Sequence, residues 1–396
     1  MYRQPRKRVL IIQSQIKQYR APFYEELYKR LYEQGVELRV AYSDPTELEA
    51  RKNDTVDLPL EYGRKTKAHW FFKGKLLYQS IWNETRLADL IVIEQANKYV
   101  VNHLLVLASA LGLKKVAFWG HGWDHGPKAN LVSGWIKDCT VNLVDWWFAY
   151  TAGTAHHLAQ KGVSIARITS VENSIDTTIL REQLASISDS ELLQLRTNLG
   201  ISERSKVGLF CSGITPGRMA EFFTQTVSEI KKKCPDFEVL AIGSGPEQKY
   251  FEQAAIQYPW FHYLGPRFGR EKAAYFALSD IFLMPGVVGL AILDAFAAGI
   301  PIVTTDVPIH SPEIEYLEPG RNGVITECDV QSYAIAVARL LDDPAALKRL
   351  QAGALVSAQK YTIQAMADNF CQGIIQCLKL DSRRTSASIL QAGEQA

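Results

Sequence analysis

Several features that mark metal-binding and membrane proteins are missing from this sequence. It has no C-x-x-C pair and no cysteine or histidine spacing typical of a metal site, so we predict no metal and reduced, buried thiols in a cytosolic protein. It also has no apolar run near the ~20 residues that a membrane-spanning helix needs. The six cysteines are Cys139, Cys211, Cys234, Cys328, Cys371 and Cys377.

The net charge is also small. The formal charge of the 396-residue chain is +2, which argues against a general nucleic-acid binder. Residues 1–75 nevertheless carry 16 Lys and Arg against 10 Asp and Glu. This excess indicates either an acidic surface or substrate on that side, or ordinary solvated charge.

The first strand lacks a dinucleotide-binding loop. Val9–Ile12 is followed by QSQIKQYR, without G-x-G-x-x-G, which disfavours a Rossmann dehydrogenase. Met1–Arg8 leads directly into this strand, so we expect no signal peptide and a cytoplasmic protein, soluble or peripheral on the inner face of the membrane.

Strands and helices alternate along the chain, which predicts parallel sheets with crossover helices. One series of strands precedes residue 175, and a second starts after the polar helix predicted over 188–199. The fold class is α/β, with two facing, doubly wound, Rossmann-like domains, a cleft between them and C-terminal helices. We place the domains at 1–175 and 176–360, a helix that packs back on the first domain at 361–380, and a polar tail at 381–396.

The predicted strands and helices follow from short apolar runs and helical periodicity. The strands are 9–12, 36–40, 90–93, 116–119, 147–150, 207–211, 239–242, 261–264, 281–284 and 302–305. The helices are 22–32, 100–111, 129–144, 188–199, 332–341, 345–361 and 362–378.

The stretch Ile281–Thr305 organises the second series. It reads as a buried strand, a turn bracketed by Gly286 and Gly289, a helix ended by Gly299, and another strand. A helix N-terminus behind a glycine turn at the carboxyl end of a strand is a site for an anion.

One segment combines basic and aromatic residues. Gly63–Lys75 reads GRKTKAHWFFKGK. We expect either a loop whose aromatic side chains pack into the first domain or a patch that docks on anionic lipid headgroups.

From Val9 to about Leu378 the chain resembles glycosyltransferases of the GT-B fold, in the large retaining group called family 4. Relatives usually have Glu, seven residues and Glu across the turn and helix, then Pro-Glu and Gly-x-Asn-Gly. Here Gly286 and Asp294 stand at the two Glu positions, followed by Pro312-Glu313 and Gly320–Gly323.

The resemblance implies a donor site for a nucleotide sugar in the second domain. Asp294 would hold the ribose, and the backbone of Gly286, Val287, Val288, Gly289 and Leu290 would face the sugar or phosphates. In CSGITPGR, Gly213 stands where relatives have Arg, and Arg218 stands where they have Lys; Arg218 would bind the diphosphate and stabilise the leaving group. Further donor candidates are Gly243, Gly245 and, as a substitute cation, Arg267 or Arg270.

The resemblance places the acceptor in the first domain. His121, in WGHGWDHG, would lie near the reacting sugar and is the second catalytic candidate, or else only caps its loop. The other acceptor-binding candidates are Lys17, Tyr19, Arg20, Glu94, Asn97, Asp124 and His125.

These residues imply a transferase that moves a sugar from a nucleotide diphosphate sugar to a glycan or lipid-linked acceptor with retention, without cofactor or metal, in cell-surface polysaccharide synthesis. The missing Glu and Arg at Gly286 and Gly213 keep two alternatives open. One is a non-catalytic sugar-nucleotide-binding partner of another transferase, and the other is an epimerase of the same fold.

Overall fold

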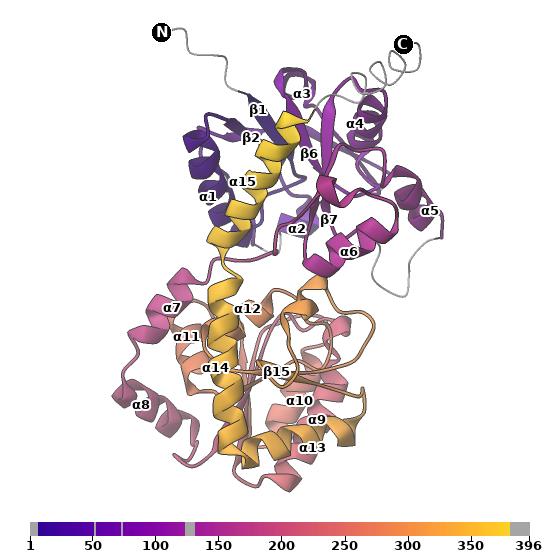
Figure 1. Ribbon diagram of the computed structural model, residues 1–396. Helices are drawn as coiled ribbons and strands as arrows, with labels where there is room; N and C mark the ends of the chain where they lie inside the picture. The colour runs from indigo at the N-terminus through magenta and orange to yellow at the C-terminus, as the bar shows by residue number, and fades with distance from the viewer. Residues whose placement is uncertain (1–6, 51–52, 73, 123–130, 381–396) are drawn as a thin grey trace. The chain divides into compact units, whose positions relative to one another are not determined.

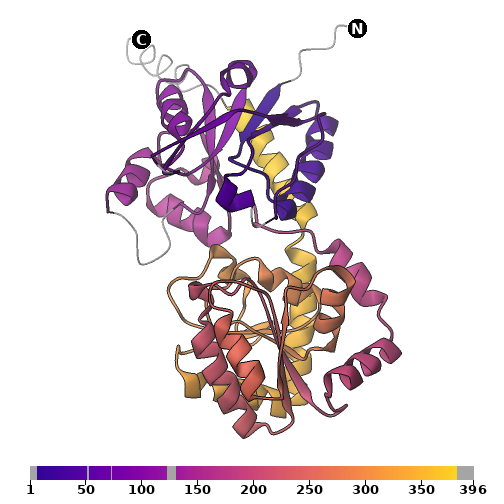
Figure 2. The ribbon, with the colours of Figure 1, turned by 180° about the vertical axis from the view of Figure 1, so that it is seen from behind.

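The computed structural model describes residues 7–50, 53–72, 74–122 and 131–380. They form two compact units: unit 1 comprises residues 1–175 and 363–396, and unit 2 comprises Asp176–Thr362. Each unit is an α/β structure with helices on both faces of a parallel sheet, as Figures 1 and 2 show, so the predicted fold class is confirmed.

Unit 1 contains a seven-stranded parallel sheet in the order β3-β2-β1-β6-β7-β8-β9. The strands are β1 (Arg8–Ile12), β2 (Glu37–Tyr42), β3 (Gly63–Lys65), β6 (Leu90–Glu94), β7 (Lys115–Gly120), β8 (Trp146–Ala149) and β9 (Ile168–Ser170), with a separate antiparallel hairpin of β4 (Ala68–Phe71) and β5 (Leu76–Gln79). Its helices are η1 (Gln18–Arg20), α1 (Ala21–Glu33), α2 (Glu47–Ala50), α3 (Trp82–Leu87), α4 (Val100–Ala110), α5 (Leu131–Thr140), α6 (Ala152–Gln160), η2 (Ile165–Arg167) and α15 (Ile363–Lys379).

Alternating side chains of the strands build a core on each face of this sheet. Val9 and Ile11 of β1 belong to one cluster, with side chains of α1 and α15, whereas Leu10 and Ile12 belong to the other. Both faces are therefore buried, which explains the continuous apolar runs in the sequence.

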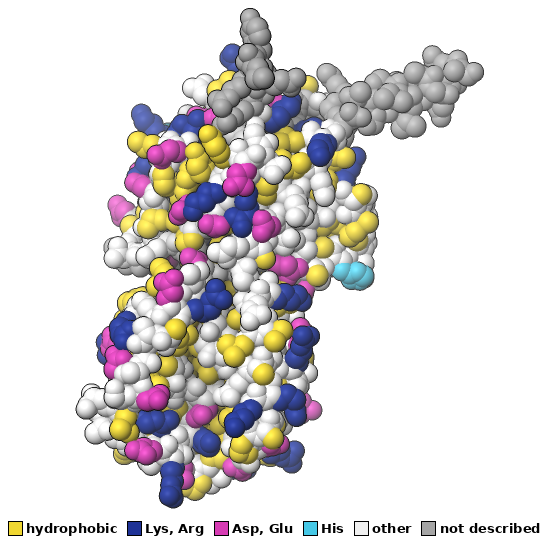
Figure 3. Space-filling view, turned by 60° about the vertical axis from the view of Figure 1, so that its left-hand side comes forward, with side chains coloured by type: hydrophobic (Ala, Val, Ile, Leu, Met, Phe, Trp, Pro, Cys, Tyr) yellow, Lys and Arg dark blue, Asp and Glu magenta, His cyan; other side chains and the backbone are white. Residues whose placement is uncertain are grey.

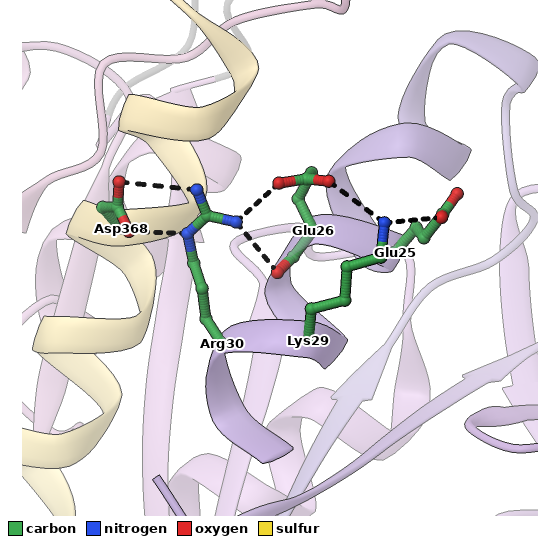
Figure 4. Close-up of polar contacts among 5 residues, drawn as sticks. All are labelled: Glu25, Glu26, Lys29, Arg30 and Asp368. Atoms are coloured by element: carbon green, nitrogen blue, oxygen red, sulfur yellow. Dashed lines mark hydrogen bonds and ion pairs between the residues drawn. The ribbon is translucent and has the colours of Figure 1, made fainter. Parts of the chain in front are cut away.

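Helix α15 returns to unit 1 and lies beside α1 in both ribbon views (Figures 1 and 2). Phe370 stacks on Phe148 of β8 with ring centroids 4.0 Å apart. At the helix surface Arg30 of α1 donates to Asp368 of α15 over 2.6 Å and to Glu26 over 2.6 Å, as Figure 4 shows. The segment expected to pack on the first domain corresponds to this helix.

Unit 2 contains a six-stranded parallel sheet in the order β12-β11-β10-β13-β14-β15. The strands are β10 (Lys206–Cys211), β11 (Phe237–Ile242), β12 (Phe261–Gly265), β13 (Ile281–Leu283), β14 (Ile302–Thr305) and β15 (Gly323–Thr326). The helices are α7 (Thr178–Ala185), α8 (Asp189–Leu199), η3 (Pro216–Arg218), α9 (Ala220–Lys233), α10 (Lys249–Gln257), α11 (Gly269–Leu278), α12 (Ala291–Ala297), η4 (Pro312–Tyr316), α13 (Val330–Asp342) and α14 (Pro344–Lys360).

The sequence missed short elements. We predicted no strand at β3, β9 or β15, and the basic–aromatic segment, for which a loop was one of two interpretations, contains β3 and β4. Strands of three or four residues are too short to show a clear alternation, so their formation depends on the neighbouring strand.

Surface charge and cysteine burial refine two further expectations. On the face shown in Figure 3, basic and acidic side chains are intermixed rather than separated by sign.

Cys139 and Cys328 are exposed, so the expectation that all six thiols are buried was wrong for these two. Exposed positions on a helix end and a loop carry no periodicity that would have shown this.

Candidate functional site

Each sheet reverses its strand order at one point. In unit 1 the strand β1 has β2 on one side and β6 on the other, and in unit 2 the strand β10 lies between β11 and β13. In open α/β sheets ligands bind outside the carboxyl ends of the strands at this point. The loops after β1 and β6, and those after β10 and β13, are therefore the two candidate sites.

In unit 2 these loops pack backbone against backbone. A Cβ atom at Gly243 would lie 1.9 Å from the carbonyl oxygen of Ser212, and one at Gly245 would lie 2.4 Å from that of Ile214. At Gly286 a Cβ atom would lie 2.3 Å from the Gly217 oxygen. Only glycine fits at these three predicted donor positions, because the loops after β10, β11 and β13 touch there.

This packing explains why the chain has no Glu at position 286. The backbone of Gly217 and Arg218 occupies the space in which any side chain at 286 would begin. Val287 N–H donates to the Gly217 oxygen over 2.8 Å and joins the two loops. Position 286, where relatives have Glu, is therefore glycine because of the path taken by the turn that carries Arg218.

The turn after β13 keeps only some of its N–H groups for a ligand. The Val287 N–H donates to the Gly217 oxygen, and the Val288 N–H donates to Nδ1 of His310. These two N–H groups are therefore not free to bind the nucleotide sugar. The N–H groups of Gly289 and Leu290 have no hydrogen-bond partner among the described residues. The expected cradle is thus smaller than the sequence suggested.

His310 holds this turn and was not predicted. Its Nδ1 accepts from Val288, so its Nε2 carries the proton that is donated to the Thr305 oxygen over 2.7 Å. Burial, together with the charge of Arg218, lowers the pKa of His310, which keeps the ring neutral. Its position just beyond the carboxyl end of β14 was the available signal in the sequence.

Arg218 is a partly buried cation at this edge. Burial lowers its pKa, but a guanidinium remains charged in proteins. Its Nη1 is buried without a hydrogen-bond partner in the described part of the chain. It precedes Met219, a non-glycine residue at φ 58°, which starts α9 without a side-chain cap. A partly buried guanidinium beside an uncapped helix N-terminus is suited to a phosphate group.

Asp294 lies in the first turn of α12 and is paired. Lys272 of α11 donates to its Oδ2 over 2.7 Å. Asp294 raises the pKa of Lys272 against the lowering effect of burial. Both charges also act on Cys211 at the end of β10, whose pKa burial raises to about 12. Lys272 was not among the predicted residues, because no sequence pattern links α11 to α12.

The other cation candidates of unit 2 lie in surface ion pairs. Arg267 pairs with Glu271 over 3.2 Å, and Arg270 with Glu191 over 2.8 Å. Gly213 follows β10 and has room for a side chain, since the nearest atom to its Cβ position is 3.9 Å away. Neither predicted substitute is brought to Arg218 by any described contact.

Unit 1 gathers four of the predicted acceptor residues around one cavity of about 180 Å³. They are Lys17, Tyr19, Arg20 and Glu94. Tyr24, Tyr99, Trp119 and Tyr150, which we did not predict, also line the cavity. Tyr24 and Trp119 look like core residues in the sequence, because they lie in α1 and β7. Tyr99 and Tyr150 lie just outside α4 and β8, where no periodicity marks them.

The cavity holds one buried cation and one carboxylate. The guanidinium of Arg20 lies 5.1 Å from the ring centroid of Trp119 and 5.9 Å from that of Tyr150. Burial raises the pKa of Glu94, while the Tyr99 hydroxyl and Arg20 oppose this rise. Such a carboxyl group can bind a hydroxyl group of a ligand.

The remaining acceptor candidates are less central. Lys17 donates to Glu49 over 2.7 Å and to Asp54 over 2.9 Å, so its charge is already compensated. The His121 ring packs edge-on against Tyr150, with centroids 4.4 Å apart. Asn97 accepts a hydrogen bond from the His103 ring through its carbonyl oxygen over 3.0 Å. Asp124 and His125 lie outside the described residues.

The basic–aromatic segment divides between two environments. Trp70 of β4 is partly buried and lines a second cavity of unit 1, whereas Phe71 and Phe72 are 49% and 74% exposed. Neither of the two expected interpretations therefore describes the whole segment. Among the described helices none is long and apolar enough to cross a membrane.

Metal-ligating side chains show no clustering in the part of the chain that the structure describes, where no group of three or more His, Cys, Asp or Glu is placed to hold an ion.

Known proteins are similar to this chain both in sequence and in fold. Residues 205–343 match the family described as "Glycosyl transferases group 1". A GDP-mannose-dependent alpha-(1-6)-phosphatidylinositol monomannoside mannosyltransferase of Mycolicibacterium smegmatis is 26% identical over 38% of this chain and 42% of its own length. A D-inositol 3-phosphate glycosyltransferase of Stackebrandtia nassauensis is 26% identical over 50% of this chain and 48% of its own. The matched regions thus span about half the length of these curated relatives, or less.

Solved structures extend the match to the whole fold. The crystal structure of Anabaena HepE in complex with UDP is similar with a TM-score of 0.67 and 15% identity, over 93% of this chain and 99% of that one. The family match covers most of unit 2, including the Arg218 and Gly286 turns, and the structural match covers both units. Residues 205–343 are therefore similar to the group 1 glycosyl transferases, and the chain has the GT-B fold.

Proposed function

We propose that this protein is a glycosyltransferase that moves a sugar from a nucleotide diphosphate sugar to a glycan or lipid-linked acceptor, with retention, as in family 4. The observation that carries the proposal is Arg218 at the start of α9, whose Nη1 is buried and has no hydrogen-bond partner among the described residues. It lies within the region that matches the family. A buried cation without a carboxylate partner costs stability unless an anion binds it.

In this proposal Arg218 and the start of α9 hold the donor diphosphate, and Asp294 holds the ribose. The bond between the sugar and the phosphate breaks ahead of the attack by the acceptor hydroxyl, and positive charge develops on the sugar. The departing phosphate oxygen takes the proton of that hydroxyl. Arg218 stabilises the negative charge on the leaving group, so the reaction needs no metal.

The donor half is tested on Arg218. The base is unassigned: one relative is named for GDP-mannose and one similar structure holds UDP, so UDP-, GDP-, ADP- and dTDP-sugars are screened by thermal shift. With the sugar that binds, Arg218→Ala should lower nucleotide release about 10²–10³-fold. Arg270→Ala is the matched control, because Arg270 is paired with Glu191 on the surface. Equal rates for wild type and Arg218→Ala would contradict the proposal.

The same assay separates the alternatives. A non-catalytic partner would bind the nucleotide sugar without turnover on any donor. An epimerase would release nucleotide without an added acceptor. Retention is read from the anomeric configuration of the product by NMR, and metal independence from an unchanged rate in EDTA.

A further inference from the structure

A second cavity adjoins the candidate acceptor cavity of unit 1. It has a volume of about 790 Å³, within the ~300–1,000 Å³ typical of small-molecule sites. The two cavities share Ser14 and Gln15 as lining residues, so they are neighbours along the carboxyl edge of the sheet. We call the 180 Å³ cavity the inner cavity and this one the outer cavity.

Trp70 supplies the aromatic wall of the outer cavity. It lies on β4, opposite Leu77 of β5, and is partly buried, whereas its neighbours His69 and Phe71 on the other side of the strand are exposed. The hairpin therefore turns this indole toward the cavity and away from solvent. A flat apolar ring in an otherwise polar wall matches the C–H face of a sugar ring.

The other walls of the outer cavity are rich in carboxylates. Asp44, Glu47 and Glu49 line it, with Lys98 as its cation. Carboxylate oxygens accept hydrogen bonds from hydroxyl groups. Asp44 pairs with Lys65 over 2.7 Å and Glu49 with Lys17 over 2.7 Å, so the charges of this wall are largely balanced and it offers no excess of positive charge to an acidic ligand.

The inner cavity has polar groups that lack partners. Tyr24 and Trp119 line it and are 0% and 3% exposed. The Tyr24 hydroxyl and the Trp119 indole N–H are buried without a hydrogen-bond partner among the described residues. A buried polar group without a partner costs about 1–3 kcal/mol, so a bound ligand is a natural partner for each. Together with Glu94 they offer both donors and an acceptor, which suits hydroxyl groups.

We propose that the two cavities form one groove for an uncharged oligosaccharide, with one sugar in the inner cavity among Glu94, Tyr24 and Trp119 and the next sugar stacked on Trp70. The inference rests on the proposed function, because the sugar in the inner cavity would carry the acceptor hydroxyl. It narrows the acceptor from an acidic or lipid-linked molecule to a growing neutral glycan chain.

The experiment measures binding by the full chain to an array of neutral oligosaccharides, with anionic glycans and phosphatidylglycerol vesicles beside them. The tightest neutral ligand is then titrated by intrinsic fluorescence. Trp70→Ala should weaken its binding at least 10-fold, and Trp70→Phe, which keeps an aromatic face, should retain most of it. Phe72→Ala is the matched control, since Phe72 belongs to the same hairpin connection and is 74% exposed; it should bind as the wild type does.

Several outcomes would overturn the groove. They are no saturable binding of any neutral glycan, tighter binding of anionic glycans or vesicles, an unchanged affinity in Trp70→Ala, or an equal loss in Phe72→Ala. A nucleotide-sugar thermal shift on the same samples shows that Trp70→Ala is folded, and it separates the two proposals. A chain that binds nucleotide sugar but no neutral glycan contradicts only the groove, whereas a chain that binds glycan but no nucleotide sugar contradicts the proposed function.

Discussion

The carboxyl edges of the two sheets are built in different ways. In unit 2 the edge is built from backbone, with three glycines at which loops touch and one partly buried arginine. In unit 1 the edge is built from side chains, with five aromatic residues and a carboxylate around a cavity. A backbone edge is fixed by the fold and can hold a constant group such as a diphosphate, whereas a side-chain edge can change with each substitution.

The first prediction adds one methyl group where two loops of unit 2 pack backbone against backbone. Gly243→Ala would place its Cβ 1.9 Å from the Ser212 oxygen, at φ +141°, which L residues rarely adopt. We expect the free energy of unfolding of unit 2 to fall by about 3 kcal/mol, from overpacking and backbone strain. Urea unfolding measures this change.

Two glycines at comparable places are the controls. At Gly213, after β10, the nearest atom to a Cβ is 3.9 Å away, and at Gly120, the last residue of β7 in unit 1, it is 3.7 Å away. Both Gly→Ala variants should stay within about 0.5 kcal/mol of the wild type. A loss at Gly120 as large as that at Gly243 would contradict the distinction between the two edges.

The second prediction tests the partly buried ion pair of Lys272 and Asp294 at the backbone edge. Asp294→Asn leaves Lys272 without its partner, and the side chains of the pair are only 17% and 24% exposed. We expect a loss of about 2 kcal/mol in the free energy of unfolding, toward the lower end of the cost of breaking a buried pair. Nucleotide affinity should fall as well if Asp294 also binds the ribose.

The double variant Asp294→Leu with Lys272→Met separates the two effects. Replacing both charges by apolar groups should restore most of the stability, because no uncompensated charge remains. Nucleotide affinity should stay low. If affinity returned together with stability, Asp294 would have a structural role alone.

The difference between the edges also explains what the sequence could predict. The glycine turns of unit 2 resemble those of a known family, so the resemblance indicated Arg218, Gly243 and Gly286 together. The partners of these residues come from other helices and loops: Lys272 from α11 and His310 from the loop after β14. No local pattern links such residues, because their proximity is created by the sheet order.

Unit 1 was harder to predict for a related reason. The sequence around Tyr24 and Trp119 looks like that of any buried helix or strand. Only the fold shows that these two residues border a cavity. Trp70 was noticed as part of a basic, exposed segment. The alternation of the short strand β4 turns it inward, while Phe71 stays exposed. Strand formation in three or four residues depends on pairing with distant residues, which periodicity cannot show.

The last prediction concerns the carboxylate of the side-chain edge. Burial raises the pKa of Glu94 in the folded protein, so the folded state binds its proton more tightly than the unfolded state does. The stability that this group contributes is therefore present below its unfolded pKa and is lost as the pH rises through its folded pKa. Glu94→Gln cannot ionise, so its stability relative to the wild type should increase with pH.

Urea unfolding of both proteins from pH 4 to pH 8 measures this difference, with Glu61→Gln, at an exposed position, as the control that should follow the wild type. We expect the smallest effect of the three, since the Tyr99 hydroxyl and Arg20 already offset part of the cost of burying the carboxylate. A difference between Glu94→Gln and wild type that does not change with pH would mean that water reaches Glu94 in the free protein. The inner cavity would then be an open part of the edge rather than a closed subsite for a sugar.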